Sequence, residues 1–188
     1  MFDNKKNSMK IFACACLVLS SFLCVACDDD GGAKPKTLSN KVEKGAPDQI
    51  SINPEVVFVD SSFTKAVLNA GRARIYQQRM ETWLDGGLKL DFFSKKSGNR
   101  ISHLVADSAK IDDRTRDMFA FGNVVVVSDS TGSRLETQVL EWNNRTQKLY
   151  SNEFVRINTP NETIEGYGFE SDPSLKNYRI SRVSGVKR

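Results

Sequence analysis

The chain has 188 residues and a formal net charge of +4, with 27 lysines and arginines against 23 aspartates and glutamates. So small an excess of positive charge, without a basic stripe interleaved with aromatic residues, argues against a nucleic-acid partner. Four cysteines and one histidine leave few candidates for a metal site or a nucleophilic catalyst.

The N-terminus has the pattern of a bacterial export signal. Lysines in the first ten residues precede a nearly unbroken apolar run, Ile11–Cys27, which is shorter than the ~20 residues that span a bilayer. The segment Leu23–Cys27 resembles a lipobox, although Cys24 stands where an aliphatic or small residue is usual. We therefore predict cleavage before Cys27 and attachment of lipid to its thiol. An uncleaved membrane anchor and plain secretion are the alternatives.

Three parts follow from this pattern. Residues 1–26 are predicted to be a signal peptide of lipoprotein type, residues 27–53 a flexible tether, and residues 54–188 the ordered domain. The tether is rich in Gly, Pro, Lys, Ser and Glu and has few apolar residues. All four cysteines precede residue 28, so the domain is expected to have no disulfide and no thiolate metal site.

The domain reads as a succession of strands without helices between them. Pro54–Phe63 is the expected first strand, followed by a strand from Leu68, a turn after Ile75 and a strand near Thr82–Trp83. Gly86–Gly87 is expected to break the chain before the alternating stretch Leu88–Phe92. Further strands are expected at 104–111, 118–127 (kinked at 122–123), 135–142, 155–158, 164–171 and 177–186, separated by turns rich in Gly, Asn and Asp.

An eight-residue motif recurs along these strands. Leu104–Ile111 is matched by 68–75, 135–142 and, more loosely, 164–171, so that the copies begin 36, 31 and 29 residues apart. Spacings of roughly 20–50 residues are typical of stacked repeats. Apolar or small residues occupy positions one, three, six and eight of the motif. This spacing predicts a strand with one extra residue, a β-bulge, which keeps the same face inward along its length.

The repeat also predicts which valines face inward after the kink. Val155 and Ile157 alternate with polar residues, and by internal correspondence Val124 and Val126 form the inner pair of the preceding unit. Strands joined by short turns imply an antiparallel meander. The sequence therefore predicts an all-β domain with one apolar inner face.

Residues that could support catalysis are scarce. His103 is the only histidine, and it adjoins Ser102 on a strand, which places the two side chains on opposite faces. The carboxylates of Asp112 and Asp113 lie in a turn and are not set apart from other solvated residues. We expect no enzymatic activity, no cofactor and no metal.

The order of these segments resembles the LptC family, the periplasmic bridge component of the lipopolysaccharide-export machine. The resemblance rests on Leu88–Phe93, Leu104–Ile111, Phe121–Val127, Leu135–Asn143 and Ile164–Asp172, and it covers the chain from about Val56 to the C-terminus. Many relatives keep an N-terminal membrane helix, whereas this chain resembles a lipoprotein. The contacts which that helix would make with the transporter are therefore not expected here.

The resemblance implies a twisted, partly open antiparallel β-jelly-roll built from repeated strand units, with an internal V-shaped groove. Such proteins receive lipopolysaccharide from an inner-membrane ABC transporter and pass it to a soluble periplasmic bridge protein of the same fold. We expect this chain to lie in the periplasm, anchored to the inner membrane through Cys27. The alternative is a structural envelope lipoprotein, a β-repeat scaffold for protein–protein contacts without lipid cargo.

The third motif position is always small, which would leave room for the acyl chains of lipid A along the inner face. A filled sandwich core, in which small residues only permit close packing, is the alternative. Direct contact with lipid is predicted for Ile111, Met118, Leu140, Trp142, Leu149 and Ile157. The full predicted groove also includes Leu90, Phe92, Leu104, Ala106, Ala109, Val124, Val126, Leu135, Thr137, Val155, Ile164, Gly166 and Phe169.

The C-terminal arm is the predicted partner edge, because an unclosed meander ends in unpaired backbone groups that invite a partner strand. Alternation places Tyr178, Ile180 and Arg182 on one face, so Arg182 would interrupt an otherwise apolar row. This edge, with Val186, is expected to dock the bridge protein, while the opposite end near Val56–Val59 faces the transporter. The alternative is that the arm is an internal strand.

Overall fold

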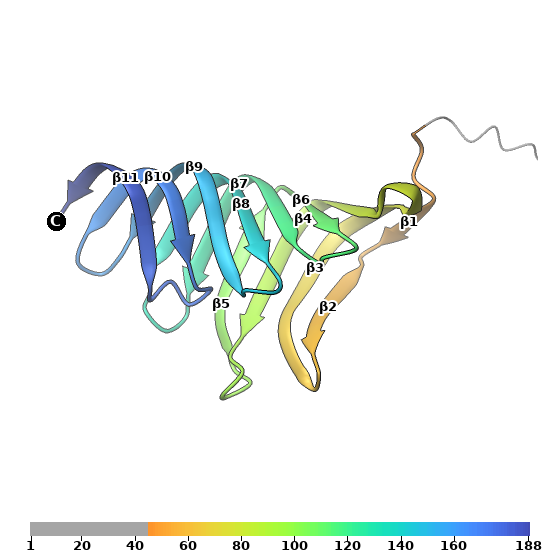
Figure 1. The fold of residues 1–188 in the computed structure, drawn as a ribbon, viewed down its shortest axis with the longest axis horizontal. Helices are drawn as coiled ribbons and strands as arrows, with labels where there is room; N and C mark the ends of the chain where they lie inside the picture. Colours follow the sequence, from red (N-terminus) through yellow and green to blue (C-terminus); the bar gives the residue numbers. More distant parts are fainter. Residues whose placement is uncertain (1–44) are drawn as a thin grey trace, which may run out of the picture. The chain divides into compact units, whose positions relative to one another are not determined.

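Residues 45–188 are described by the computed structural model, and they form one antiparallel β-sheet (Figure 1). The predicted signal peptide, Cys27 and most of the predicted tether lie outside the described residues. Within 45–188, no helix is long and apolar enough to cross a membrane. The strands are β1 (Gln49–Ile52), β2 (Glu55–Asp60), β3 (Phe63–Tyr76), β4 (Glu81–Phe93), β5 (Arg100–Ala106), β6 (Ser108–Asp112), β7 (Met118–Ser128), β8 (Arg134–Asn143), β9 (Lys148–Asn158), β10 (Thr163–Ser171) and β11 (Tyr178–Lys187), with a 3-10 helix η1 (Gln77–Arg79) between β3 and β4.

The strand order confirms the predicted antiparallel meander. The sheet runs β1-β3-β4-β5-β7-β8-β9-β10-β11, with β2 also paired to β3, and β6 bridging β4 and β7. Every pairing is antiparallel, and most neighbours in the sheet are also neighbours in sequence. One edge is therefore made by β1 and β2 and the other by β11, at opposite ends of the sheet in Figure 1.

Two expectations about strand limits differ from the structure. Gly86 and Gly87 do not break the chain: β4 runs through both, and their φ angles of 81° and 88° accommodate a bulge within the strand. The ordered sheet also begins earlier than Pro54, because Gln49–Ile52 pairs with Ile75–Arg72 of β3. That segment is short and carries polar residues at alternate positions, which left it indistinguishable from the predicted tether.

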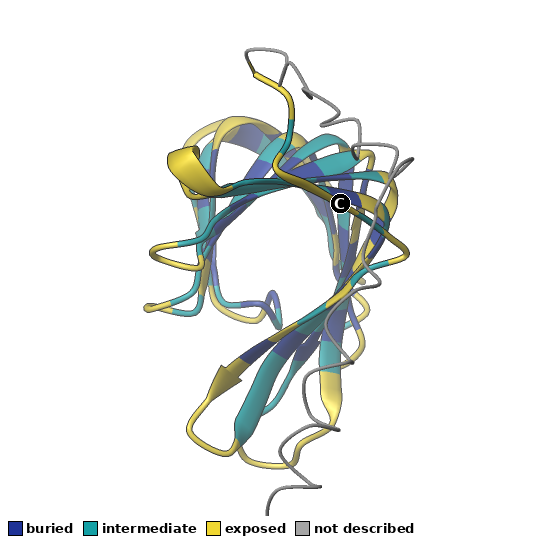
Figure 2. Ribbon diagram, turned by 90° about the vertical axis from the view of Figure 1, so that its right-hand side faces the viewer, coloured by how far each residue is buried: buried dark blue, intermediate teal, exposed yellow. Residues whose placement is uncertain are grey.

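A line of bulges crosses the sheet near the middle of its long strands. The register shifts after Ala70 in β3, after Phe121 in β7, after Thr137 in β8 and after Tyr167 in β10, and Asp107 separates β5 from β6. We call this feature the bulge line. The predicted slip of one residue is confirmed, because motif positions three and six are both buried in all four copies. The extra residue at each register shift, however, lies in the partner strands β4, β7, β9 and β11 and not in the motif strands themselves. Because bulges bend strands, the sheet curls around its own inner face (Figure 2).

The core lies inside this curl. On one side of the bulge line, a continuous cross-strand row, here the apolar row, comprises Val56, Leu68, Leu90, Leu104, Val126, Leu135, Ile157, Ile164 and Val186. On the other side, the tryptophan row comprises Ile75, Thr82, Ile111, Met118, Trp142, Leu149, Ser171 and Tyr178. The buried members of both rows belong to one hydrophobic core, whose burial provides the main stabilisation of the sheet.

Candidate lipid-binding face

The inner face of the sheet collects all the predicted groove residues. Each of them is buried except Ile164, which is half-buried and packs against the core. The inner pair of β7, Val124 and Val126, is 1% and 0% exposed, as the repeat predicts. The alternation of the strands and the bulge line together bring these positions onto one surface. Their contact with lipid stays a prediction.

The apolar row spans the whole sheet. Val56 lies on β2 at one edge, Val186 lies on β11 at the other, and every step between them is a direct cross-strand pair. The row is fully covered in its middle but opens towards β11, where Val186 is 53% exposed. It therefore forms an unbroken strip of branched aliphatic side chains from one sheet edge to the other.

The two sides of the bulge line close on each other. Trp142, in the tryptophan row, meets the rings of Phe58 and Phe92 edge-on, with centroid distances of 4.9 Å and 5.4 Å. Phe58 and Phe92 belong to a third row on the opposite side of the bulge line, the phenylalanine row (Phe58, Ala66, Phe92, Ser102 and Ser128). These are the rows farthest from the bulge line on either side, so their contact shuts the inner face.

Two further contacts hold this closure. The Lys65 ammonium on β3 donates to the backbone carbonyl of Asn144 at 3.2 Å and to its side-chain oxygen at 3.3 Å. Leu175, in the loop between β10 and β11, is 1% exposed and belongs to the core. Around Trp142 the inner face is therefore packed with side chains, as the filled-core alternative expects, whereas towards β11 it is more open. The single antiparallel sheet agrees with the predicted partly open β-jelly-roll.

The small residues at the third motif position lie beside the bulge line. A Cβ on Gly166 would approach the Arg182 carbonyl oxygen to 2.3 Å, and the Thr137 hydroxyl donates to the Phe154 carbonyl at 2.9 Å. Here the small side chains allow neighbouring strands to approach closely. At Gly166 and Thr137, the room that the sequence assigned to acyl chains is therefore occupied by the protein itself.

The edge strand β11 pairs only with β10 among the described strands, so the internal-strand alternative does not hold. Tyr178 and Ile180 are half-buried, and Tyr178 stacks on Phe169 with a centroid distance of 6.4 Å. Arg182 was predicted to share a face with Tyr178 and Ile180. Its guanidinium instead lies over the ring of Tyr167, 5.3 Å from the ring centroid, and Tyr167 is 40% exposed. A register shift between β10 and β11 places Val183 opposite Gly166, which breaks the simple alternation.

A family model described as lipopolysaccharide-assembly, LptC-related, matches residues 13–186, nearly the whole chain. The chain belongs to the LptC family. No curated protein matches it. Membership confirms the resemblance and assigns to this LptC protein a role in lipopolysaccharide transport, as a periplasmic component of the cell envelope. The family is a transport component and not an enzyme family.

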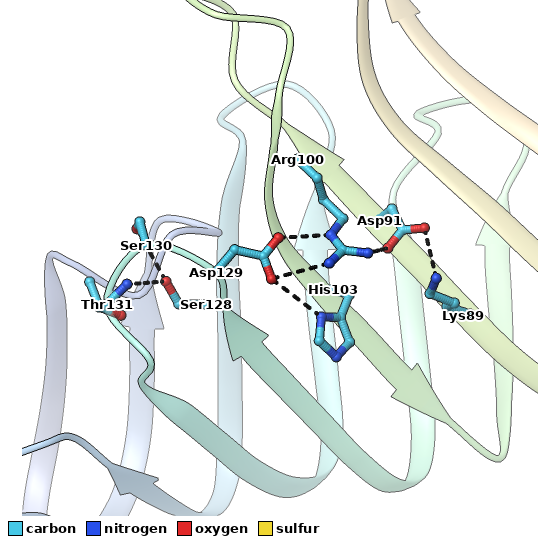
Figure 3. A network of polar contacts seen from close by, with 8 residues as sticks. All are labelled: Lys89, Asp91, Arg100, His103, Ser128, Asp129, Ser130 and Thr131. Atoms are coloured by element: carbon cyan, nitrogen blue, oxygen red, sulfur yellow. Dashed lines mark hydrogen bonds and ion pairs between the residues drawn. The ribbon is translucent and has the colours of Figure 1, made fainter.

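The outer face of this LptC protein carries a group of ion pairs around Arg100. Arg100 joins two carboxylates, with Nε 2.7 Å from Asp129 and a terminal nitrogen 3.4 Å from Asp91, and Lys89 lies 3.3 Å from Asp91 (Figure 3). The hydrogen bond from Arg100, aided by its charge, holds the pKa of Asp129 below its usual range. His103 Nδ1 lies 3.7 Å from Asp129, whereas its neighbour Ser102 is fully buried on the inner face.

That geometry separates the one histidine from the adjacent serine, as their positions in a strand predict. Within residues 45–188, no group of three or more His, Cys, Asp or Glu side chains could hold a metal ion. Nothing in the polar network of Figure 3 arranges a nucleophile beside a base.

Sequence reasoning missed several residues of the inner face. Leu68, Leu84, Leu88 and Ala120 are buried there. The first motif position of Leu68 and the alternation of Leu88 with Leu90 and Phe92 could have identified two of them. Leu175 gave no such signal, because it belongs to a turn and not to an alternating strand. Its φ of 54° and its burial are set by tertiary packing alone.

Proposed function

We propose that this protein is tethered to the inner membrane, receives lipopolysaccharide from an ABC transporter and passes it to a soluble bridge protein of the same fold. The apolar row is the observation that carries the proposal. It connects the β1/β2 edge to the β11 edge without a polar interruption. Acyl chains that move along the row would keep apolar surroundings from one partner to the next.

Lipid entry requires the tryptophan and phenylalanine rows to separate. Acyl chains that take the place of these contacts keep the inner side chains away from water, so the apolar surface stays buried. Burial of the chains themselves contributes about 25 cal/mol per Å². The opened sheet is therefore stabilised by its cargo, and the closed one by its own side chains.

The two edges of the sheet suit docking by strand addition. The backbone groups of β11 on the side away from β10 have no partner strand among the described residues, and this strand carries Arg179, Arg182 and Lys187. At the other edge, Val57 and Val59 of β2 are 46% and 62% exposed. We assign β11 to the bridge protein and the β1/β2 edge to the transporter.

The proposed anchor is the lipidated thiol of Cys27, with residues 1–26 removed. Residues 27–48 then form the tether, because the sheet begins at Gln49. Intact-mass analysis of protein extracted from membranes should give a diacyl or triacyl adduct on a chain that starts at Cys27. An unmodified chain beginning at Met1 would contradict this anchor.

Photo-crosslinking tests the lipid path. A photoreactive residue at Leu140 or Trp142, both on the inner face, should capture lipopolysaccharide in cells, whereas one at Glu141 or Arg145 should not. Glu141 alternates with these two positions and pairs with Phe119 and Tyr150 on the outer face, so it is a matched control. Equal yields at all four positions would contradict a lipid path along the inner face.

A scaffold without lipid cargo is the second candidate, and the closed inner face favours it. Both candidates expect β11 to bind the bridge protein, so deletion from Asn177 onward should abolish capture of that protein and spare binding to the transporter. Crosslinked lipid at Leu140 would exclude the scaffold. A folded truncated protein that still captures the bridge would place the interface elsewhere.

A further inference from the structure

Three buried polar atoms on the inner face lack any hydrogen-bond partner within the described residues: the Ser102 hydroxyl, the Trp142 indole nitrogen and the Ser171 hydroxyl. Their residues are 0%, 0% and 1% exposed. Buried polar groups are nearly always hydrogen-bonded, and each exception in a folded protein calls for an explanation. Trp142 and Ser171 both pair with the apolar Leu149, and Ser102 pairs with Phe92 on one side and with Ser128 on the other.

The three atoms lie on the tryptophan row and the phenylalanine row, the two margins whose contact closes the inner face. Ser102 is the cross-strand neighbour of Phe92, whose ring packs against Trp142. Ser171 belongs to the tryptophan row, separated from Trp142 only by Leu149. The margins therefore carry hydrogen-bond donors, whereas the apolar row deeper inside carries none.

A cleft of about 360 Å³ leads to this margin from outside. Its walls include Phe92 and Ile101 from one side of the closure, and Gln147 and Pro173 from the turns of the other side. Lys65, which holds the closure through Asn144, also lines the cleft. The cleft thus lies where the two sides would first separate.

We propose that this margin is a subsite for the amide and ester linkages at the head of the acyl chains. The inference rests on the proposed function and deepens it. Carbonyl oxygens of such linkages accept hydrogen bonds from the indole N–H and the two hydroxyls, while the hydrocarbon continues inward along the apolar row. A plain hydrocarbon offers no acceptor, so the subsite selects acylated lipids over alkanes and fixes how deeply the chains enter.

The donors should act in opposite directions on the empty and the loaded protein. In the closed protein an unpaired buried hydroxyl is destabilising, so Ser102→Ala and Ser171→Ala should each raise the urea midpoint. In the loaded protein the same change removes a hydrogen bond, so each variant should bind purified lipopolysaccharide about fivefold more weakly. A variant that raised the urea midpoint without weakening lipopolysaccharide binding, or weakened binding without raising the midpoint, would overturn the inference.

Ser128→Ala is the matched control. Ser128 is 1% exposed and is the cross-strand neighbour of Ser102, but its hydroxyl accepts the Thr131 backbone N–H at 3.2 Å and contacts Ser130. Its removal should lower the urea midpoint and leave lipopolysaccharide affinity unchanged. The same response at Ser102 and Ser128 would contradict a ligand-specific role.

Trp142 provides a direct spectroscopic readout. The chain has two tryptophans, so Trp83→Phe leaves Trp142 as the single emitter. Lipopolysaccharide should shift its emission to longer wavelength by hydrogen bonding to the indole, and dodecane should not. Suppose that lipopolysaccharide co-elutes with the protein, but the Trp142 emission and the serine variants respond to it as they do to dodecane. The subsite is then refuted, and the proposed function stands. If lipopolysaccharide does not bind the wild-type protein at all, both fail.

Discussion

Gly166 is the position at which the last strand of the sheet depends most directly on the lack of a side chain. A Cβ there would lie 2.3 Å from the Arg182 carbonyl oxygen and 2.7 Å from the Ile180 Cγ2 atom, both in β11. We expect Gly166→Ala to displace β11 from β10. Because β11 is the proposed edge for the bridge protein, the same change should also weaken that interaction.

The magnitude follows from these distances. Contacts of a Cβ below 3.4 Å are rare, so the Arg182 carbonyl must retreat by about 1 Å. A shift of that size breaks the adjacent β10–β11 hydrogen bonds, each with a net contribution of about 1 kcal/mol. Alanine also reduces the entropy of the unfolded chain, which offsets about 0.4–1 kcal/mol. The free energy of unfolding should fall by about 1–3 kcal/mol.

Gly185→Ala is the control, because it adds the same methyl group to β11 itself. Its Cβ would meet nothing closer than Glu165 Oε2 at 3.6 Å, an ordinary contact, and its φ is not positive. That variant should retain or slightly gain stability. Urea unfolding and hydrogen exchange of amides 178–187 measure both effects. Wild-type stability and wild-type amide protection in Gly166→Ala would refute the argument.

Three other predictions concern the core and the outer face. Leu90 lies near the middle of the apolar row, and Leu90→Ala should lower the free energy of unfolding by about 2–5 kcal/mol. Val105 is 39% exposed on the outer face, so Val105→Ala should lower it far less. Urea unfolding compares the two variants. Thr137→Val should cost about 1–3 kcal/mol by the same measurement, because it removes the hydrogen bond from the buried Thr137 side chain to the Phe154 carbonyl. The hydrogen bond from Arg100 depresses the pKa of Asp129 below 3.8. The contribution of the ionised Asp129 carboxylate to folding stability is therefore present above that pH and is lost as the pH falls through the depressed pKa. Asp129→Asn should therefore show a smaller loss of stability between pH 7 and about pH 3 than the wild type, and an equal loss would contradict the assignment.

Local patterns in the sequence accounted for much of the fold. The motif with its extra residue predicted the bulge line, and internal correspondence predicted that Val124 and Val126 face inward. Both predictions were possible because a bulge and a two-residue alternation are recorded in consecutive side chains. The expectation that Gly86–Gly87 would break β4 was wrong. Paired glycines are suited both to a turn and to a bulge, and only the pairing of β4 with β3 shows that they form a bulge here.

The candidate site was less accessible to such reasoning. Alternation placed Leu104, Trp142 and Ile157 on the inner face, but an apolar groove and a packed core have the same alternation. The orphan donors at Ser102 and Ser171 could not be recognised, because a hydroxyl is unpaired only in relation to what surrounds it. Arg182 was misplaced for a similar reason, since its position over Tyr167 depends on the neighbouring strand β10, which is irregular between Tyr167 and Phe169.

The sequence by itself determined the all-β class, the repeat, the family and the direction in which most side chains point. These properties depend on the order of polar and apolar residues within single strands. Only the tertiary structure decided that the inner face is closed by Trp142 against Phe58 and Phe92, that Leu175 joins the core, and that β11 remains an edge. Those features join residues far apart in the chain, and their free energy comes from packing that no local pattern specifies.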